Sequence, residues 1–115
     1  MAELVKKNFN TPDEKVTSPK AITEIVSFHD MPIARVTFDV GWNFSDHVKP
    51  MVGTESCQMA HLWYVISGRM VTKMDDGTQE ELGPGDVTYI APGHDAWVIG
   101  EEPCVLVDFQ RISRL

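Results

Sequence analysis

The apolar residues of this chain recur mostly at every second position, which is the spacing of strands that bury one face. Ala34, Val36, Phe38 and Val40 alternate with polar residues, and residues 59–65 repeat the pattern. Turn-forming residues separate such segments at the short, regular spacing that is typical of sandwiches and barrels. No apolar period of 3.6 residues, which would indicate a long helix, is sustained. We therefore predict an all-β fold.

About nine short strands follow from this pattern. The first starts at residue 22, and the others are expected at residues 34–40, 41–47, 59–65, 70–74, 78–82, 87–90, 96–99 and 105–109. Asp76 and Gly77 are a typical hairpin turn between two of them. Residues 1–20 are polar and carry turn signals, so they are expected to form an irregular arm with a short strand around residues 2–5. Residues 21–115 are expected to form a single β domain.

The length, charge and cysteine content of the chain argue against several classes of partner and location. The chain has 115 residues, enough for one core without disulfides. Its formal charge of −7 argues against nucleic acid or an anionic membrane as a partner. No stretch approaches the ~20 apolar residues of a membrane span, and the first ten residues lack the apolar run of a secretory signal. With only two cysteines, we expect free thiols and a cytoplasmic location.

Three of the four histidines, His47, His61 and His94, stand beside strand-like sequence and far apart along the chain. A small β barrel could bring them together around a metal ion. The thiolate of Cys57 would complete a tetrahedron, and this ligand composition suits zinc. Glu55 is the alternative oxygen ligand, and a carboxylate with two histidines would instead suit non-haem iron; nickel also stays open. Each histidine could instead have a purely structural role: His61 as a hydrogen-bonded core residue, His47 as an exposed strand-end residue and His94 as a hydrogen-bonded loop residue. Cys57 could likewise be a small buried hydrophobic side chain.

Residues 41–97 resemble the cupin superfamily, whose fold is a double-sheet jelly roll. The first cupin motif starts with a glycine, five residues and a histidine, and Gly41 and His47 match that start. Gly68 matches the glycine at its end. Lys49 stands where the motif has its second histidine, and His61 stands where it has a glutamate. The departures therefore fall on metal-ligand positions of the motif.

The chain has the turn residues of the second cupin motif but lacks the motif's metal-binding histidine. Gly85, Asp86 and Gly93 occupy the expected positions. Ala96 replaces the motif's histidine, whereas His94 lies two residues earlier. Since a glycine allows the backbone to turn sharply, His94 is expected to point inward from this earlier position.

The resemblance implies a cupin-type jelly-roll β-barrel, with a divalent metal ion and a small-molecule ligand inside it. Cupins include dioxygenases, isomerases and decarboxylases, so the first hypothesis is a small metal-binding cupin that acts on a small organic molecule. The alternative is a non-catalytic ligand-binding or sensing module, with a structural metal or none. An open coordination position favours an enzyme, and four protein ligands favour the alternative. Because cupins commonly pair through sheet edges, we also expect a homodimer.

The sequence allows two roles for several other side chains. A metal-bound imidazole needs an acceptor for its second nitrogen, and Asp95 is the candidate acceptor for His94. Lys49 either pairs with an acidic group or faces the cavity, where it could hold a substrate carboxylate. Cys104 is expected in the core. Many aromatic residues either pack between the sheets or line a ligand pocket: Trp42, Trp63, Tyr64, Tyr89 and Trp97. For Trp42 or Trp97 a dimer contact is the further alternative. We see no Ser-His-Asp order and no phosphate-binding loop, so nucleophilic catalysis and nucleotide binding are not expected.

Overall fold

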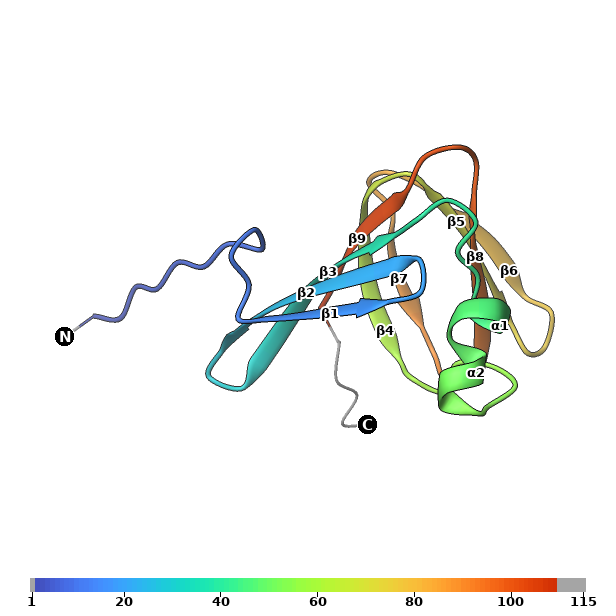
Figure 1. Cartoon of the computed structure of the whole chain (residues 1–115), viewed down its shortest axis with the longest axis horizontal. Coiled ribbons are helices and arrows are strands. Elements are labelled where there is room, and N and C mark those ends of the chain that lie inside the picture. The colour runs from blue at the N-terminus through green and yellow to red at the C-terminus, as the bar shows by residue number, and fades with distance from the viewer. Residues whose placement is uncertain (1, 110–115) are drawn as a thin grey trace.

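The computed structural model describes residues 2–109, which form nine strands and two short helices (Figure 1). The strands are β1 (Glu14–Ser18), β2 (Ala21–Phe28), β3 (Met31–Phe38), β4 (His61–Ser67), β5 (Arg69–Met74), β6 (Gln79–Leu82), β7 (Val87–Ile90), β8 (His94–Ile99) and β9 (Cys104–Asp108). The helices are α1 (Phe44–His47) and α2 (Lys49–Val52). Among these residues, no helix has the length and hydrophobicity required to cross a bilayer. The all-β prediction is confirmed.

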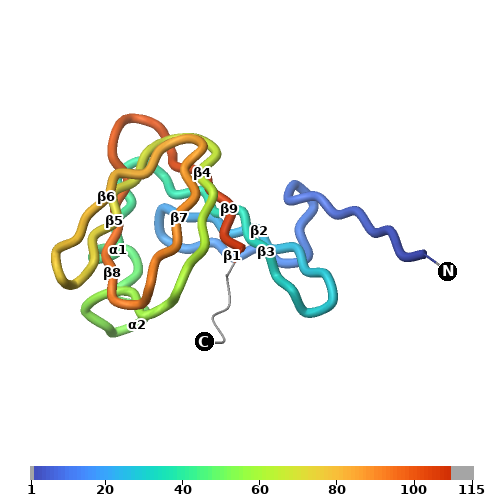
Figure 2. The backbone as a smooth tube through the Cα atoms, turned by 180° about the vertical axis from the view of Figure 1, so that it is seen from behind, coloured from blue at the N-terminus to red at the C-terminus, as the bar shows by residue number. Residues whose placement is uncertain are grey.

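Two antiparallel sheets face each other, as Figure 2 shows from behind. The larger has the order β1-β2-β3-β9-β4-β7, and the smaller has the order β6-β5-β8. The core between them draws side chains from both sheets, including Val36 and Leu106 from the larger and Met70 and Val98 from the smaller. The sheets form a jelly roll but do not close into a continuous barrel, because β1 and β7 remain edge strands.

The last strand in the sequence lies in the middle of the larger sheet. β9 pairs with β3 on one side and with β4 on the other. Its inward positions follow the period of two, so that Cys104, Leu106 and Asp108 are all buried. Two of these residues belong to an ordinary core, whereas the third is an acid. β9 therefore carries a buried carboxyl group into the space between the sheets.

The strand expected at residues 41–47 is wrong, because most of this segment is helical. The side chain of Asn43 caps α1 by accepting the backbone N–H of Asp46 at 2.8 Å. Such a cap supplies an acceptor that the first turn of a helix lacks. Pro50 lies in the first turn of α2, where its missing N–H costs nothing. His47 therefore lies on α1 rather than at a strand end.

The N-terminal segment is more regular than the expected arm. Residues 2–5 form no strand, but β1 lies within the segment and pairs with β2 along its whole length. The preceding residues extend away from the two sheets (Figure 1). The ammonium group of Lys7 holds their end against the β2–β3 hairpin, since it donates to Asp13 and to the carbonyl of Ser27, each at 2.7 Å.

Candidate metal centre

A pocket of about 300 Å³ lies between the two sheets. Its wall is largely apolar, and the polar groups that line it include a cysteine, two histidines and a buried aspartate. The lining residues are Val16, Ser18, Ala21, Thr23, Val36, Phe38, Trp42, Phe44, Val48, Met51, Val52, Cys57, Met59, His61, Trp63, His94, Ala96 and Asp108. Strands β1 to β4, β8 and β9 and both helices thus contribute to one cavity.

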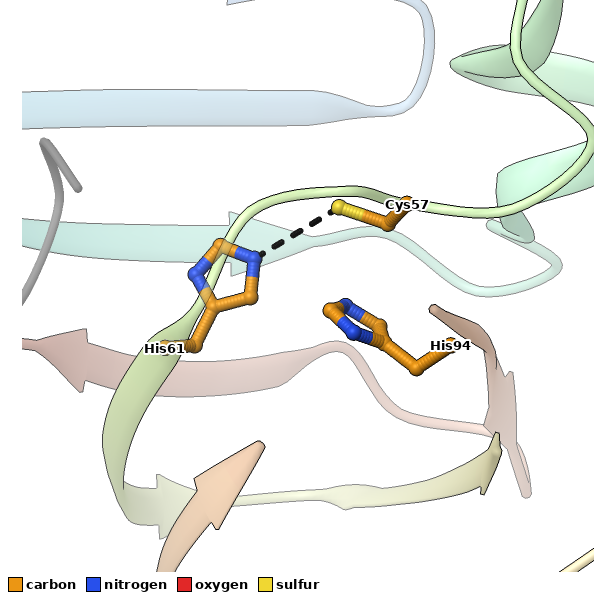
Figure 3. Close-up of side chains that lie close together, drawn as sticks. All are labelled: Cys57, His61 and His94. Atoms are coloured by element: carbon orange, nitrogen blue, oxygen red, sulfur yellow. Dashed lines mark hydrogen bonds between the residues drawn. The ribbon is translucent and has the colours of Figure 1, made fainter. Parts of the chain in front are cut away.

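Cys57, His61 and His94 converge in this pocket (Figure 3). Cys57 lies in the loop before β4, His61 is the first residue of β4, and His94 is the first residue of β8. One ligand atom from each residue lies within 4.8 Å of the other two. The Cys57 Sγ is 3.7 Å from Nε2 of His61. The three residues therefore form a group that could hold a metal ion.

The backbone fixes Cys57 beside His94. The N–H of Cys57 donates to the carbonyl of His94 at 2.7 Å, and the N–H of Gly93 donates to the carbonyl of Cys57 at 2.7 Å. Gly93 has a φ of 92°, a conformation that disfavours side chains. A Cβ atom at this position would also lie 2.9 Å from a carboxylate oxygen of Asp75. The sharp turn expected at Gly93 is therefore present, and His94 is only 2% exposed.

Asp108 orients the imidazole of His61. Its Oδ2 accepts a hydrogen bond from Nδ1 of His61 at 2.8 Å and another from Nε1 of Trp63 at 3.1 Å. Asp108 lies directly opposite Trp63 in the β4–β9 pair, and its side chain is buried. Because Nδ1 holds the proton shared with the carboxylate, Nε2 is the nitrogen that faces Cys57. This is the arrangement that supports metal-binding histidines in other proteins.

His94 is oriented by a backbone group. Its Nδ1 donates to the carbonyl of Ala91 at 2.8 Å, which places the lone pair of the neutral ring on Nε2. The expected acceptor, Asp95, does not have this role, because its Oδ1 accepts the backbone N–H of Ala96. A main-chain oxygen thus orients the second imidazole, and a carboxylate orients the first.

The thiol and the imidazole of His61 shift each other's pKa. Burial raises the pKa of Cys57, but hydrogen bonds with His61 and His94 outweigh it and lower this pKa to about 6. Burial lowers the pKa of His61, but the hydrogen bonds with Asp108 and Cys57 outweigh it and raise this pKa to about 9. Near neutral pH the ion-free pair is therefore a thiolate beside an imidazolium. A thiolate is the form of cysteine that binds metal ions.

One separation within the group matches that of two ligands on a divalent ion. In a tetrahedral zinc site, bond lengths near 2.3 Å for sulfur and 2.0 Å for nitrogen place these two ligand atoms roughly 3.6 Å apart. The observed separation of Cys57 Sγ and His61 Nε2 is 3.7 Å. One thiolate and two imidazoles form a donor set that suits zinc and other borderline metals.

The other candidate ligands lie outside this group. His47 is on α1, where its Nδ1 accepts the backbone N–H of Asn43 at 3.1 Å. Glu55 pairs with Lys49 at 2.7 Å, and its side chain is 92% exposed. Lys49 therefore pairs with an acidic group, which is one of the two roles expected for it. Of the four ligands expected from the sequence, the structure brings three together and leaves His47 apart.

Sequence reasoning did not single out Asp108. The signal was available, since the residue continues the inward series of Cys104 and Leu106 at a spacing of two. An acid at such a position requires a buried partner. Of the five expected aromatic residues, Trp42 and Trp63 line the pocket, Tyr64 and Tyr89 are exposed, and Trp97 is half-buried on β8 outside the pocket lining.

The two facing sheets and the pocket between them define a small cupin-type domain. Solved structures that share this fold include three with named proteins. The polyketide cyclase RemF from Streptomyces resistomycificus is 15% identical, with a TM-score of 0.64, over 92% of this chain and 78% of the cyclase. KdgF from Halomonas sp. is 23% identical, with a TM-score of 0.57, over 89% of this chain and 91% of KdgF.

The third is oxalate decarboxylase from Lactobacillus farciminis, 14% identical with a TM-score of 0.64. The match covers 98% of this chain but only 35% of the decarboxylase. The sequence matches no protein-family model and no curated protein. At these sequence identities the comparisons establish only the fold. The proteins that share this fold include enzymes.

Proposed function

We propose that the protein is a small metal-binding cupin that acts on a small organic molecule in the pocket. The observation that carries this proposal is the convergence of Cys57, His61 and His94 at the pocket wall. Three protein ligands leave one position of a tetrahedral ion for water or substrate, as in catalytic zinc sites. Zinc is the proposed ion, and iron or nickel are the alternatives to be distinguished by elemental analysis.

A bound divalent ion would supply Lewis acidity or a hydroxide at neutral pH. The chain's own residues would prepare the site for that chemistry. Asp108 keeps the proton of His61 on Nδ1, and the carbonyl of Ala91 does the same for His94. Phe38 and Trp63 line the pocket and are nearly fully buried, so they limit the access of water.

The test is metal content in four variants of the full chain. Wild-type protein is expected to hold one equivalent of zinc, and Cys57→Ala, His61→Ala and His94→Ala are expected to lose most of it. His47→Ala is the matched control, since it removes an imidazole outside the group, and it should keep the metal. Full metal content in His61→Ala would refute the site. Metal and ligand binding without turnover would favour the non-catalytic ligand-binding alternative.

The same residues support a second, metal-free candidate function. Cys57, His61 and Asp108 follow one another as thiol, imidazole and carboxylate, with separations of 3.7 and 2.8 Å. This order is the one used by cysteine nucleophiles. The candidate requires purified protein that holds no metal and whose Cys57 is alkylated by iodoacetamide faster than in His61→Ala. Alkylation that zinc prevents would instead support the metal centre.

A further inference from the structure

We infer that the pocket binds a neutral, flat and largely apolar molecule that carries a single carbonyl or hydroxyl oxygen. That oxygen would lie at the group formed by Cys57, His61 and His94. The inference deepens the proposed function and rests on it for the position of the oxygen. The class of ligand follows from the wall of the pocket and from its charges.

The wall offers aromatic surface and few polar atoms. Phe38 lies between Trp42 and Trp63, with ring centroids 4.3 Å and 6.2 Å away. These three rings come from β3, from the loop after it and from β4, and all three residues line the cavity. Outside the proposed metal centre, Ser18 and Thr23 supply the only hydroxyl groups among the described residues of the lining. Such a wall favours a flat apolar ligand.

Outside the proposed metal centre, the described part of the wall offers no positive charge. None of the described residues that line the pocket is a lysine or an arginine. Lys49, which could have held a substrate carboxylate, is paired with Glu55 instead. A carboxylate brought into this pocket would lose its water without gaining a cationic partner, and such burial is costly.

The proposed metal centre does not change this balance. A divalent ion carries two positive charges, and the ligated thiolate of Cys57 offsets one of them. The carboxylate of Asp108, bonded to His61, offsets the other. The centre is then neutral overall, unlike one built from imidazoles alone, so it attracts an anion only weakly. Its open position suits a neutral oxygen.

The size of the pocket limits the ligand further. A volume of about 300 Å³ lies at the lower end of the range for small-molecule sites. A single ring with a short substituent fits this volume. Acetophenone, with one carbonyl oxygen, is therefore a suitable probe, and benzoate is its anionic counterpart with the same ring.

The first experiment compares the two probes by calorimetry on zinc-loaded protein. Acetophenone is expected to bind at least about tenfold more tightly than benzoate, because an unpaired buried charge typically costs that much or more. Equal or tighter binding of benzoate would overturn the inference, and so would failure of acetophenone to bind.

A charge placed inside the pocket provides the matched test. Ser18→Arg puts a guanidinium at a half-buried lining position, and it should raise the affinity for benzoate about tenfold. Thr17→Arg is the control, because Thr17 is exposed and does not line the pocket. An equal gain in both variants would show a long-range effect of charge and would contradict the inference.

Repeating both titrations after chelation separates this inference from the proposed function. If the protein holds no zinc but still prefers acetophenone, the metal centre fails and the ligand class stands. If zinc binds through the three residues but benzoate is preferred, the ligand class fails and the metal centre stands.

Discussion

Asp108→Asn tests whether the buried carboxylate supports the proposed metal centre. Asparagine has nearly the same shape and keeps an oxygen that can accept the hydrogen bonds of His61 and Trp63. It removes the negative charge that lies 2.8 Å from Nδ1 of His61. The imidazole is then a weaker ligand, because the carboxylate no longer polarises its N–H bond.

Loss of such a supporting group typically lowers metal affinity by about 10- to 100-fold, or ~1.4 to 2.7 kcal/mol. The change can be measured by zinc competition against a coloured chelator, and the absorption bands of the cobalt-substituted protein would report any change in ligand geometry. Trp63→Phe is the control, since it removes the second donor to the same oxygen and leaves the bond to His61 in place. Affinity of Asp108→Asn within twofold of wild type would refute this reasoning.

Three further predictions concern stability, ionisation and assembly. Chelation should lower the melting temperature by several degrees, because an ion at 100 times its dissociation constant contributes about 2.7 kcal/mol; an unchanged melting curve would contradict ligation. In chelated protein the thiolate absorbance of Cys57 should appear with a midpoint near pH 6, and a midpoint above pH 8 would contradict the pairing with His61. We also expect a homodimer that Tyr89→Lys, on the outer face of the edge strand β7, weakens; light scattering that shows a wild-type monomer at micromolar concentration would count against it.

The paired pKa shifts have opposite effects on stability. The lowered pKa of Cys57 adds stability that is fully present above the pKa of an unfolded thiol and is lost as the pH falls through about 6. The raised pKa of His61 adds stability that is fully present below the pKa of an unfolded imidazole and is lost as the pH rises through about 9. Between these values the proton has moved from sulfur to nitrogen, so the two slopes nearly cancel. The pair should therefore leave little pH dependence in the melting temperature of chelated protein between pH 6.5 and 9.

Local pattern was enough to predict most strands. The alternation in β3 places Ala34, Val36 and Phe38 in the core, as the period of two requires. The helix α1 could not be predicted in this way, because four residues are too few to show an apolar period of 3.6 residues. The only side-chain cap at its start is Asn43, and asparagine is also a favoured residue in turns.

The site required pairing between distant segments, which local patterns do not specify. The chemistry of cysteine and histidine was sufficient to name Cys57, His61 and His94 as a possible group. The position of His47 depended on the conformation of residues 41–47. Because this segment was predicted to be a strand, His47 was wrongly expected to reach the site. The role of Asp108 depended on β9 lying beside β4, a contact between residues 47 positions apart. An inward acid can be recognised in the sequence, but its partner cannot.

The central position of β9 has a consequence for synthesis in the cell. While the ribosome is still translating β8, residues Cys57, His61 and His94 have been made, but β3 and β4 lack the strand that joins them. The nascent polypeptide would then present two unpaired strand edges and an imidazole without its carboxylate. The proposed centre therefore cannot reach its final geometry until β9 has joined β3 and β4, although its three candidate ligands are made earlier.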